Sequence, residues 1–337
     1  AATREHGNIE AHLFGILGAS FLDQSLILPA NQSPLGALPA RFRRERVLII
    51  GCGDIGLRVA RGLAGRLRLL ALTSSPRRVS DLRAAGVTPL LGDLDMPLSL
   101  RRLAGLATRV VHLAPPPGEG WGDPRTRALA QVLRLRSVPI SLVYGSTSGV
   151  YGDCQGAVVT ENRVASPRTA RASKRASAEQ AVRFLGRSVR QAGGVRTSIL
   201  RIPGIYAPDR EGGTPRARLL KRTPVLMDQD DVYTNHIHAD DLARACRLAL
   251  WRGKPQRVYN VSDDTRLKMG EYFDLAARLY GLPRPPRVAR DTAQDQLPLM
   301  LLSFMSESRL LDNTRMKREL GLALRYPTVS TGLLAEK

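Results

Sequence analysis

The sequence predicts an α/β protein built on a doubly wound parallel sheet, with a small C-terminal part that caps the substrate. Two observations support this fold class. From Arg46 onward, short aliphatic runs alternate with segments of helical length, a pattern typical of right-handed βαβ units. The runs are also apolar on both faces, as expected for strands covered by helices on either side.

Seven aliphatic runs are the predicted strands of this sheet. They are interrupted by helix-length segments, and the order of strand and helix is kept up to about residue 265. Beyond that point the alternation weakens into a mainly helical tail, most clearly broken by LPRPP at 282–286. The predicted strands are 47–50, 68–73, 88–92, 109–114, 140–146, 196–202 and 257–262.

The same pattern predicts the division of the chain. We expect a sheet domain over 45–265, with lid segments inserted at about 153–175 and 207–238, and a mainly helical cap over 266–337. Residues 1–44 show no core pattern and are rich in proline and polar residues towards their end. They are predicted to be a disordered extension, with a targeting segment as the alternative.

Composition excludes several classes of function. The net charge is +21, yet only six of the 51 basic residues are lysines and the 45 arginines are scattered, which disfavours nucleic acid as a partner. Cys52, Cys154 and Cys246 lie too far apart for a disulfide framework or a zinc site. No apolar stretch reaches the length of a membrane span. We therefore expect a cytoplasmic monomer or homodimer with no metal.

A glycine-rich loop joins the first predicted strand to a helix in VLIIGCGDIGLRVARGL. In this G-x-G-x-x-G motif Gly51 would allow a tight turn, Gly53 would let the backbone approach a pyrophosphate, and Gly56 would permit close helix–strand contact. The helix N-terminus offers unpaired N–H groups to the phosphates. We predict dinucleotide binding at these glycines with Asp54 and Ile55; a turn without a ligand is the alternative.

The end of the second strand, LLALTSSPRR, bears on the choice of dinucleotide. An NAD-selective site places an acidic residue about 20 residues after the loop, where it accepts a hydrogen bond from the ribose 2′-OH. Here hydroxyls and arginines stand instead, and guanidinium binds phosphate bidentately. The sequence therefore predicts NADP(H) at Ser74 and Arg78, with NAD(H) as the alternative. A purely structural interpretation is that Arg77 and Arg78 are solvated at a helix start.

The ends of the next two strands predict the rest of the cofactor site. In GDLD, Asp93 is placed to accept a hydrogen bond from an adenine amino group, with Leu94 beside the ring. The second carboxylate, Asp95, fits the N-cap of a helix equally well as a place in this site. Ala114 and Pro115 follow the fourth strand, where they would face the cofactor ribose.

Seven short motifs then follow one another along about 46–334: GCGDIG, GDL, HLA, STSGVYGD, LRIPGIYAP, NHIHADDLA and YNVSDD. Their order resembles that of the extended short-chain dehydrogenase/reductase superfamily, often labelled NAD-dependent epimerase/dehydratase. The resemblance implies an N-terminal Rossmann domain that binds NAD(P), with Ser146 and Pro203 among the residues near the cofactor. It also implies a smaller C-terminal part, which in many members holds a nucleotide sugar.

One family motif is missing from this chain. The family's chemistry uses a Ser or Thr together with Tyr and Lys in Y-x-x-x-K. Thr147 matches the hydroxyl, but aligning PRTARASKRASAEQAV on Ala178-Glu179 places Arg171 and Arg175 where the tyrosine and lysine should be. No register restores the motif, and arginine stays protonated, so that it cannot act as the acid. The departure resembles atypical members that bind the cofactor without the catalytic tyrosine.

Two tyrosines, Tyr151 and Tyr206, remain on family motifs. We take Thr147 and Tyr151 as the candidate catalytic residues, while Asp240 is expected to cap the helix that follows it. Two functions stay open. The first is an NADP(H)-dependent oxidoreductase or epimerase-like enzyme acting on a small polar substrate, anionic or derived from a sugar. The second is a non-catalytic NADP(H)-binding sensor or regulatory protein.

Overall fold

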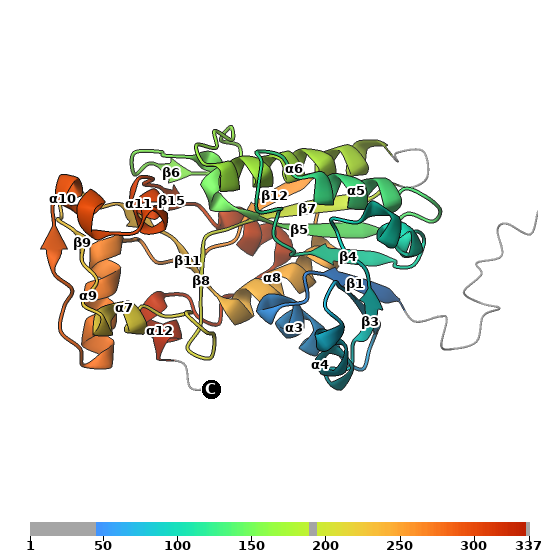
Figure 1. Ribbon diagram of the computed structural model, residues 1–337, viewed down its shortest axis with the longest axis horizontal. Coiled ribbons are helices and arrows are strands. Elements are labelled where there is room, and N and C mark those ends of the chain that lie inside the picture. The colour runs from blue at the N-terminus through green and yellow to red at the C-terminus, as the bar shows by residue number, and fades with distance from the viewer. Residues whose placement is uncertain (1–44, 189–193, 335–337) are drawn as a thin grey trace, which may run out of the picture. The chain divides into compact units, whose positions relative to one another are not determined.

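The computed structural model describes residues 45–188 and 194–334 (Figure 1). The predicted extension, residues 1–44, lies outside this range. Within it, all three cysteines are buried and form no disulfide. In the described ranges no helix is both long enough and apolar enough to cross a membrane. No group of three His, Cys, Asp or Glu side chains that could hold a metal ion occurs there either.

A seven-stranded sheet forms the centre of the fold, in the order β12-β7-β5-β4-β1-β2-β3. Every neighbouring pair is parallel. Each of the seven predicted runs contributes one strand, which confirms the predicted fold class. The strands are β1 (Arg46–Ile50), β2 (Arg68–Thr73), β3 (Thr88–Leu91), β4 (Arg109–His112), β5 (Ser141–Thr147), β7 (Arg196–Ile202) and β12 (Arg257–Asn260).

Helices cover both faces of this sheet (Figure 1). On one face α3 (Asp54–Arg61), α4 (Val79–Ala84) and α8 (Ala239–Arg252) pack against Val47 and Ile49 of β1. On the other, α5 (Pro124–Val132) and α6 (Ala170–Ser188) pack with Leu48 and Ile50 in a second core. Consecutive residues of β1 are thus buried on opposite faces, because side chains alternate along a strand. This double burial explains why the run is apolar throughout.

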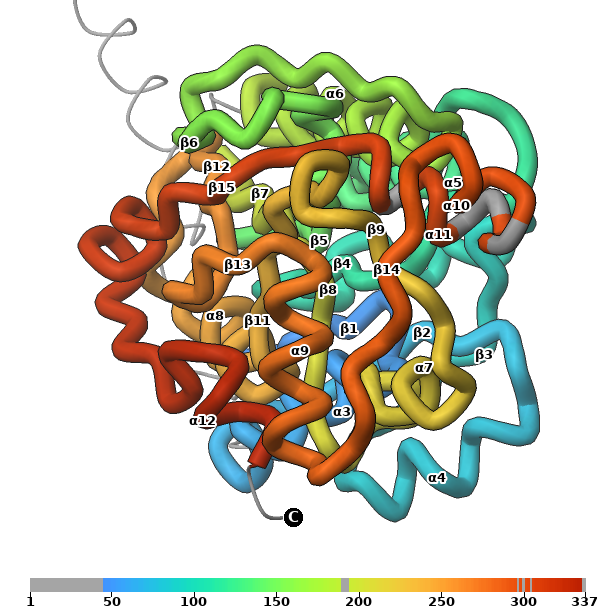
Figure 2. Tube along the Cα trace, turned by 90° about the vertical axis from the view of Figure 1, so that its left-hand side faces the viewer, coloured from blue at the N-terminus to red at the C-terminus, as the bar shows by residue number. Residues whose placement is uncertain are grey.

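The C-terminal part is assembled from two separate stretches of chain. Its core surrounds α9 (Met269–Tyr280) and α7 (Arg216–Leu220), which lie in front of the sheet in Figure 2. Short helices α10 (Arg290–Gln296), α11 (Leu299–Met305) and α12 (Val329–Leu333) complete it. Two two-stranded pairs link these stretches: β9 (Val225–Leu226) with β14 (Arg287–Val288), and β10 (Tyr233–Thr234) with β13 (Leu267–Lys268). A third pair, β8 (Gly204–Tyr206) with β11 (His236–His238), lies within the first stretch, and a fourth, β6 (Val158–Val159) with β15 (Leu310–Leu311), joins the tail to the segment after β5.

The tail also returns to the sheet domain. A π-helix at Met316–Leu320 places Met316 and Leu320 in the same core as α3 and α8. The tail therefore belongs in part to the core beneath the sheet and in part to the cap.

Candidate functional site

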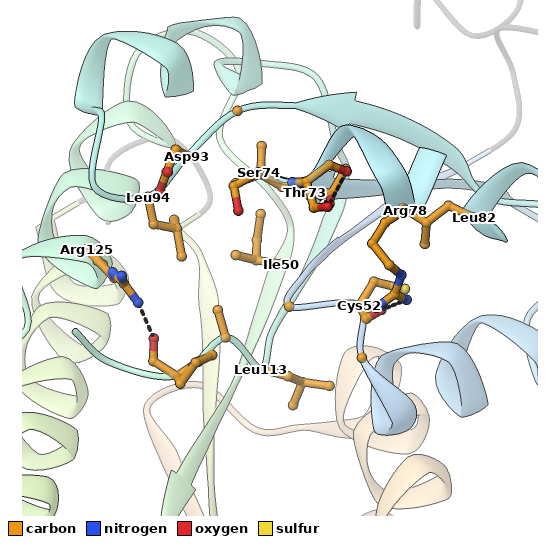
Figure 3. A pocket seen from close by; sticks show the side chains of 17 residues that line it. Ile50, Cys52, Thr73, Ser74, Arg78, Leu82, Asp93, Leu94, Leu113 and Arg125 are labelled. Carbon is orange, nitrogen blue, oxygen red and sulfur yellow. Dashed lines mark hydrogen bonds between the residues drawn. The ribbon is translucent and has the colours of Figure 1, made fainter. Parts of the chain in front are cut away.

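A pocket of about 450 Å³ opens at the carboxyl ends of β1, β2, β3 and β4 (Figure 3). In a doubly wound sheet, ligands bind at this edge, beside the point where the strand order reverses. That point lies here between β1 and β4. The pocket brings together eight of the residues predicted to bind the cofactor: Gly51, Gly53, Ser74, Arg78, Asp93, Leu94, Ala114 and Pro115.

The three glycines of the loop have different surroundings. Gly51 has φ +83°, and a Cβ there would lie 2.3 Å from the Ala114 backbone nitrogen. At Gly56 a Cβ would lie 3.0 Å from the Gly51 carbonyl oxygen and 3.2 Å from Ile49 Cγ2 of β1, so the helix lies close to both the loop and the strand. A Cβ at Gly53 would meet nothing within 4 Å. Gly53 is the N-cap of α3 and supplies no side-chain cap, so no side chain at this position covers the first N–H groups of α3.

Arg78 borders one end of the pocket. It ends the short 3-10 helix η2 (Pro76–Arg78), and its Nη2 donates to the Cys52 carbonyl oxygen at 3.1 Å. Its nearest carboxylate is that of Asp81, at 3.9 Å, and its side chain is 40% exposed. Burial raises the pKa of the Cys52 thiol to about 11, although the charge of Arg78 acts in the other direction. The guanidinium therefore lies at the pocket edge with its charge only weakly offset.

The opposite end of the pocket is closed by a residue that the sequence did not indicate. Arg125, in the first turn of α5, lines the pocket beside Leu94 (Figure 3). Its Nε donates to Asp95 Oδ1 at 2.6 Å, and its Nη1 donates to the Pro115 carbonyl oxygen at 3.3 Å. The hydrogen bond from Arg125 lowers the pKa of Asp95. The N-cap expected of Asp95 is wrong, because η3 (Pro97–Leu103) is preceded by Met96.

Five other predicted cofactor residues do not line the pocket. Ile55 packs on the core beneath α3, and Gly56 touches the strand. The Ser146 hydroxyl donates to Glu179 Oε1 at 2.7 Å. Pro203 lies half-buried between β7 and β8, and Asp54 takes part in an ionic cluster.

That ionic cluster is centred on Arg58 of α3. Arg58 donates to Asp54 at 3.0 Å, to Asp209 at 2.7 Å and to Asp240 at 2.5 Å. Burial opposes the charge of Arg58, yet its pKa is raised because the hydrogen bonds to the three carboxylates outweigh burial. The cluster joins α3 to the loop after β8 and to the first turn of α8. The cap expected of Asp240 is supplied by His238 instead, whose Nδ1 accepts from the Asp240 N–H at 3.2 Å.

The two candidate catalytic residues lie at the end of β5, outside the pocket. Thr147 Oγ1 accepts from the Gly149 N–H at 3.3 Å and caps the short helix η4 (Ser148–Tyr151). Tyr151 is 1% exposed, and its hydroxyl donates to Asn260 Oδ1 at 2.7 Å. Burial raises the pKa of Tyr151, although the nearby Arg201 acts in the other direction. The phenol therefore has a partner inside the protein.

Tyr206 is buried as well, at 2% exposure, and its hydroxyl donates to the Thr328 carbonyl oxygen at 3.3 Å. Burial raises its pKa, and the charge of Asp263 adds to this effect. Neither tyrosine on the family motifs has a hydroxyl that lines the pocket. A neutral phenol held in this way is poorly suited to exchange a proton with a ligand.

The first two turns of α6 supply cations to the ends of β4 and β5. Arg175 Nη1 donates to the carbonyl oxygens of Ala114 at 3.2 Å and Gly145 at 2.9 Å, and to the Tyr144 hydroxyl at 3.1 Å. Lys174 Nζ donates to the carbonyl oxygens of residues 117 and 118, at 2.8 and 2.6 Å. These side chains tie α6 to the strand ends beside the pocket.

Solved structures share this fold. A functionally unknown conserved protein from Silicibacter pomeroyi DSS is 30% identical, with a TM-score of 0.71, and the match covers 86% of this chain and 96% of that one. The UDP-glucose 4-epimerase of Thermotoga maritima, solved with UDP-glucose, is 18% identical with a TM-score of 0.69 (85% and 96% covered). A nucleoside-diphosphate-sugar epimerase from Pseudomonas aeruginosa is 18% identical with a TM-score of 0.70 (86% and 95%).

The latter two likenesses, at under 25% identity, show the fold alone. None of the curated proteins matches the chain. The family model described as the NAD dependent epimerase/dehydratase family matches residues 47–262, which hold the whole seven-stranded sheet except Arg46. The glycine-rich loop at Gly51–Gly56, between β1 and α3, agrees with that match, and the chain belongs to the NAD dependent epimerase/dehydratase family.

Proposed function

We propose that this chain binds NADP(H) in the pocket at the β-strand ends, in preference to NAD(H). The observation that carries this proposal is the position of Arg78, which borders the pocket next to the exposed Ser74. In the described part of the chain, Asp93 is the only carboxylate that lines the pocket, and it follows β3 instead of β2. A 2′-phosphate would therefore find a guanidinium and a hydroxyl, and no acid to repel it.

The rest of the pocket is suited to the other parts of the dinucleotide. The N-terminus of α3, left open by Gly53, would hold the pyrophosphate. Asp93 and Leu94 would contact the adenine, with Arg125 closing that end, and Ala114 and Pro115 would face a ribose. When bound, the cofactor supplies a hydride donor or acceptor. The side chains that line the pocket would bind and orient it.

We further propose that the proton relay of the family is absent. Arg171 and Arg175 stand where the family pattern places its tyrosine and lysine, and an arginine keeps its protons. Tyr151 and Tyr206, the alternatives, are buried in hydrogen bonds to Asn260 and Thr328. Of the candidate catalytic residues, Thr147 keeps a partly exposed side chain. General acid–base assistance is worth about 10²–10⁴-fold in rate, so turnover by this chain would be slow.

Two activities are consistent with such a site. The loss of the relay favours a non-catalytic NADP(H)-binding sensor or regulatory protein. Retention of Thr147 at the strand end favours an oxidoreductase or epimerase-like enzyme acting on a small anionic or sugar-derived substrate, whose charge the arginines of α6 would attract. We take cofactor binding without efficient catalysis as the function that the site supports best.

Calorimetric titration with NADPH and NADH tests the choice of cofactor. Wild type should bind NADPH more tightly, and Arg78→Ala should weaken NADPH binding by about 1–3 kcal/mol while leaving NADH binding unchanged. Arg77→Ala is the matched control, since Arg77 is exposed, adjoins Arg78 and does not line the pocket. Equal affinity of the wild type for the two cofactors would overturn the preference.

Single-turnover assays with a panel of sugar nucleotides and simple sugar phosphates test the chemistry. We expect slow or undetectable hydride transfer by the wild type, a further loss in Thr147→Ala, and no specific effect of Tyr151→Phe beyond its effect on stability. Fast turnover that is lost in Tyr151→Phe would return Tyr151 to the role of acid. Fast turnover that both substitutions leave intact would mean that the active site lies elsewhere.

A further inference from the structure

The start of α6 has a charge arrangement opposite to the one helices prefer. Its first six residues include Arg171, Lys174 and Arg175 and contain no acid. The N-terminus of a helix is already the positive end of its dipole, so acidic side chains stabilise this end and basic ones do not. Departures from such a local preference are expected at functional or strained sites.

Two of these cations are held by uncharged oxygens alone. Arg175 donates to the carbonyl oxygens of Ala114 and Gly145 and to the Tyr144 hydroxyl. Lys174, which is 6% exposed, donates to two carbonyl oxygens of the loop after β4. Within residues 45–188 and 194–334, neither side chain forms an ion pair. Their positive charge is therefore fixed in place by neutral partners and is not cancelled by them.

The carboxylates nearby offset this charge only in part. Glu179, one turn further along α6, is engaged with Arg201 through contacts of 3.0 and 2.7 Å. Asp123 caps α5 and accepts from the Thr126 N–H and hydroxyl at 2.9 and 2.8 Å. Asp123 thus supplies one negative charge against the cations of α6, and the region stays positive.

These cations lie on the other side of β1 from Arg78 and Asp93, which follow β2 and β3. Arg175 reaches the ends of β4 and β5, across the point where the strand order reverses. A dinucleotide lies across this point, with one half on either side. If adenine lies on the side of β2 and β3, the nicotinamide half lies on the side of β4 and β5.

The two redox states of nicotinamide differ in charge. The oxidised ring carries a positive charge and the reduced ring is neutral. We propose that Arg175 and Lys174 make the site select NADPH over NADP⁺, by repelling the oxidised ring. This inference rests on the proposed binding of NADP(H). At an effective dielectric constant of about 20, two like charges about 10 Å apart repel strongly enough to weaken binding about tenfold.

The test is the ratio of two dissociation constants, that for NADP⁺ over that for NADPH, measured by calorimetry at constant ionic strength. The wild type should give a ratio of about ten or more. Arg175→Met and Lys174→Met should each lower the ratio several-fold, and Arg175→Lys, which keeps the charge, should preserve it. Arg187→Met is the control: it removes the same charge from an exposed position on α6, about 18 Å along the helix and beyond the screening length.

A wild-type ratio near one would overturn the inference, even if the methionine variants failed to fold. So would an unchanged ratio in both folded methionine variants, or an equal fall in Arg187→Met. Failure of the proposed NADP(H) preference would be visible separately, as equal binding of NADPH and NADH. In that event the ratio for NAD⁺ over NADH still tests the effect of the cations, because the ring charge is the same.

Discussion

Substitutions at two glycines of the same loop should separate folding from ligand binding. Gly51 and Gly53 are two residues apart, yet their surroundings differ. At Gly53 φ is −81°, which any residue adopts, and a Cβ would meet no atom within 4 Å. Threonine is also accepted at a helix N-cap. Gly53→Thr should therefore change the free energy of unfolding by less than about 1 kcal/mol.

The same substitution should remove cofactor binding. The space beside Gly53 belongs to the pocket, and a threonine side chain would occupy the path by which a pyrophosphate reaches the N–H groups of α3. We expect the affinity for NADPH to fall by at least about a hundredfold, which corresponds to about 2.7 kcal/mol.

Gly51→Ala, in contrast, should lower the stability of the fold. Its φ of +83° is strained for alanine, and the new Cβ would lie 2.3 Å from the backbone nitrogen of Ala114, which cannot rotate away as a side chain could. Left-handed strain of about 1–2 kcal/mol and overpacking of about 1–3 kcal/mol together predict a loss of about 2–5 kcal/mol in stability.

Denaturant unfolding gives the stability of each variant, and calorimetric titration with NADPH gives its affinity. Tight NADPH binding by Gly53→Thr would show that the pyrophosphate does not pass this glycine, and the assignment of the pocket would fail. Wild-type stability of Gly51→Ala would show that the turn between β1 and α3 is not constrained as its geometry indicates.

Two further predictions concern ion pairs that hold the domain together. Arg58→Met should lower the free energy of unfolding by about 2 kcal/mol, because the three carboxylates that Arg58 joins are each about a third exposed and each pair contributes up to about 1 kcal/mol. Arg61→Met, at an exposed position on the same helix, is the control. Equal losses of stability in the two variants would contradict the role of the cluster. The hydrogen bond from Arg257 lowers the pKa of Glu319 to about 2 from its usual 4.5, so this pair stabilises the fold above pH 4.5 and its contribution is lost as the pH falls towards 2. Glu319→Gln should remove that part of the acid sensitivity, about 1 kcal/mol, and an unchanged slope of stability against pH in this window would contradict it.

Much of the sheet could be predicted because its signals are local. A run such as VLII is apolar at every position because both faces of β1 are covered, and the glycine spacing of the loop follows from turn and contact requirements within a few residues. The strand order and the pocket at the strand ends then follow from general rules for βαβ units.

The parts that the sequence did not indicate depend on residues far apart in the chain. Arg125 meets Asp95 across 30 positions, and Arg58 meets Asp240 across 182. The two-residue strands of the cap are too short to show a period of two. Tyr151 shows the same limit: its motif was visible, but its burial against Asn260 depends on a contact 109 positions away.

The residues that would bind the cofactor and those that would transfer a proton come from different elements. A substitution can therefore remove proton transfer without changing cofactor binding. The loops after β1, β2 and β3 supply Gly53, Arg78 and Asp93, whereas the proton relay of the family would come from α6, on the far side of β4. Arg175 makes its hydrogen bonds to the ends of β4 and β5 and to Tyr144, and in the described part of the chain Ala114 is the only pocket-lining residue among these partners. If Arg175 stands in place of the family's lysine, as we propose, this exchange would leave the loops after β1, β2 and β3 undisturbed, because no hydrogen bond of Arg175 within residues 45–188 and 194–334 reaches them. Cofactor affinity can then persist after the proton relay is lost, which is the combination that the proposed function requires.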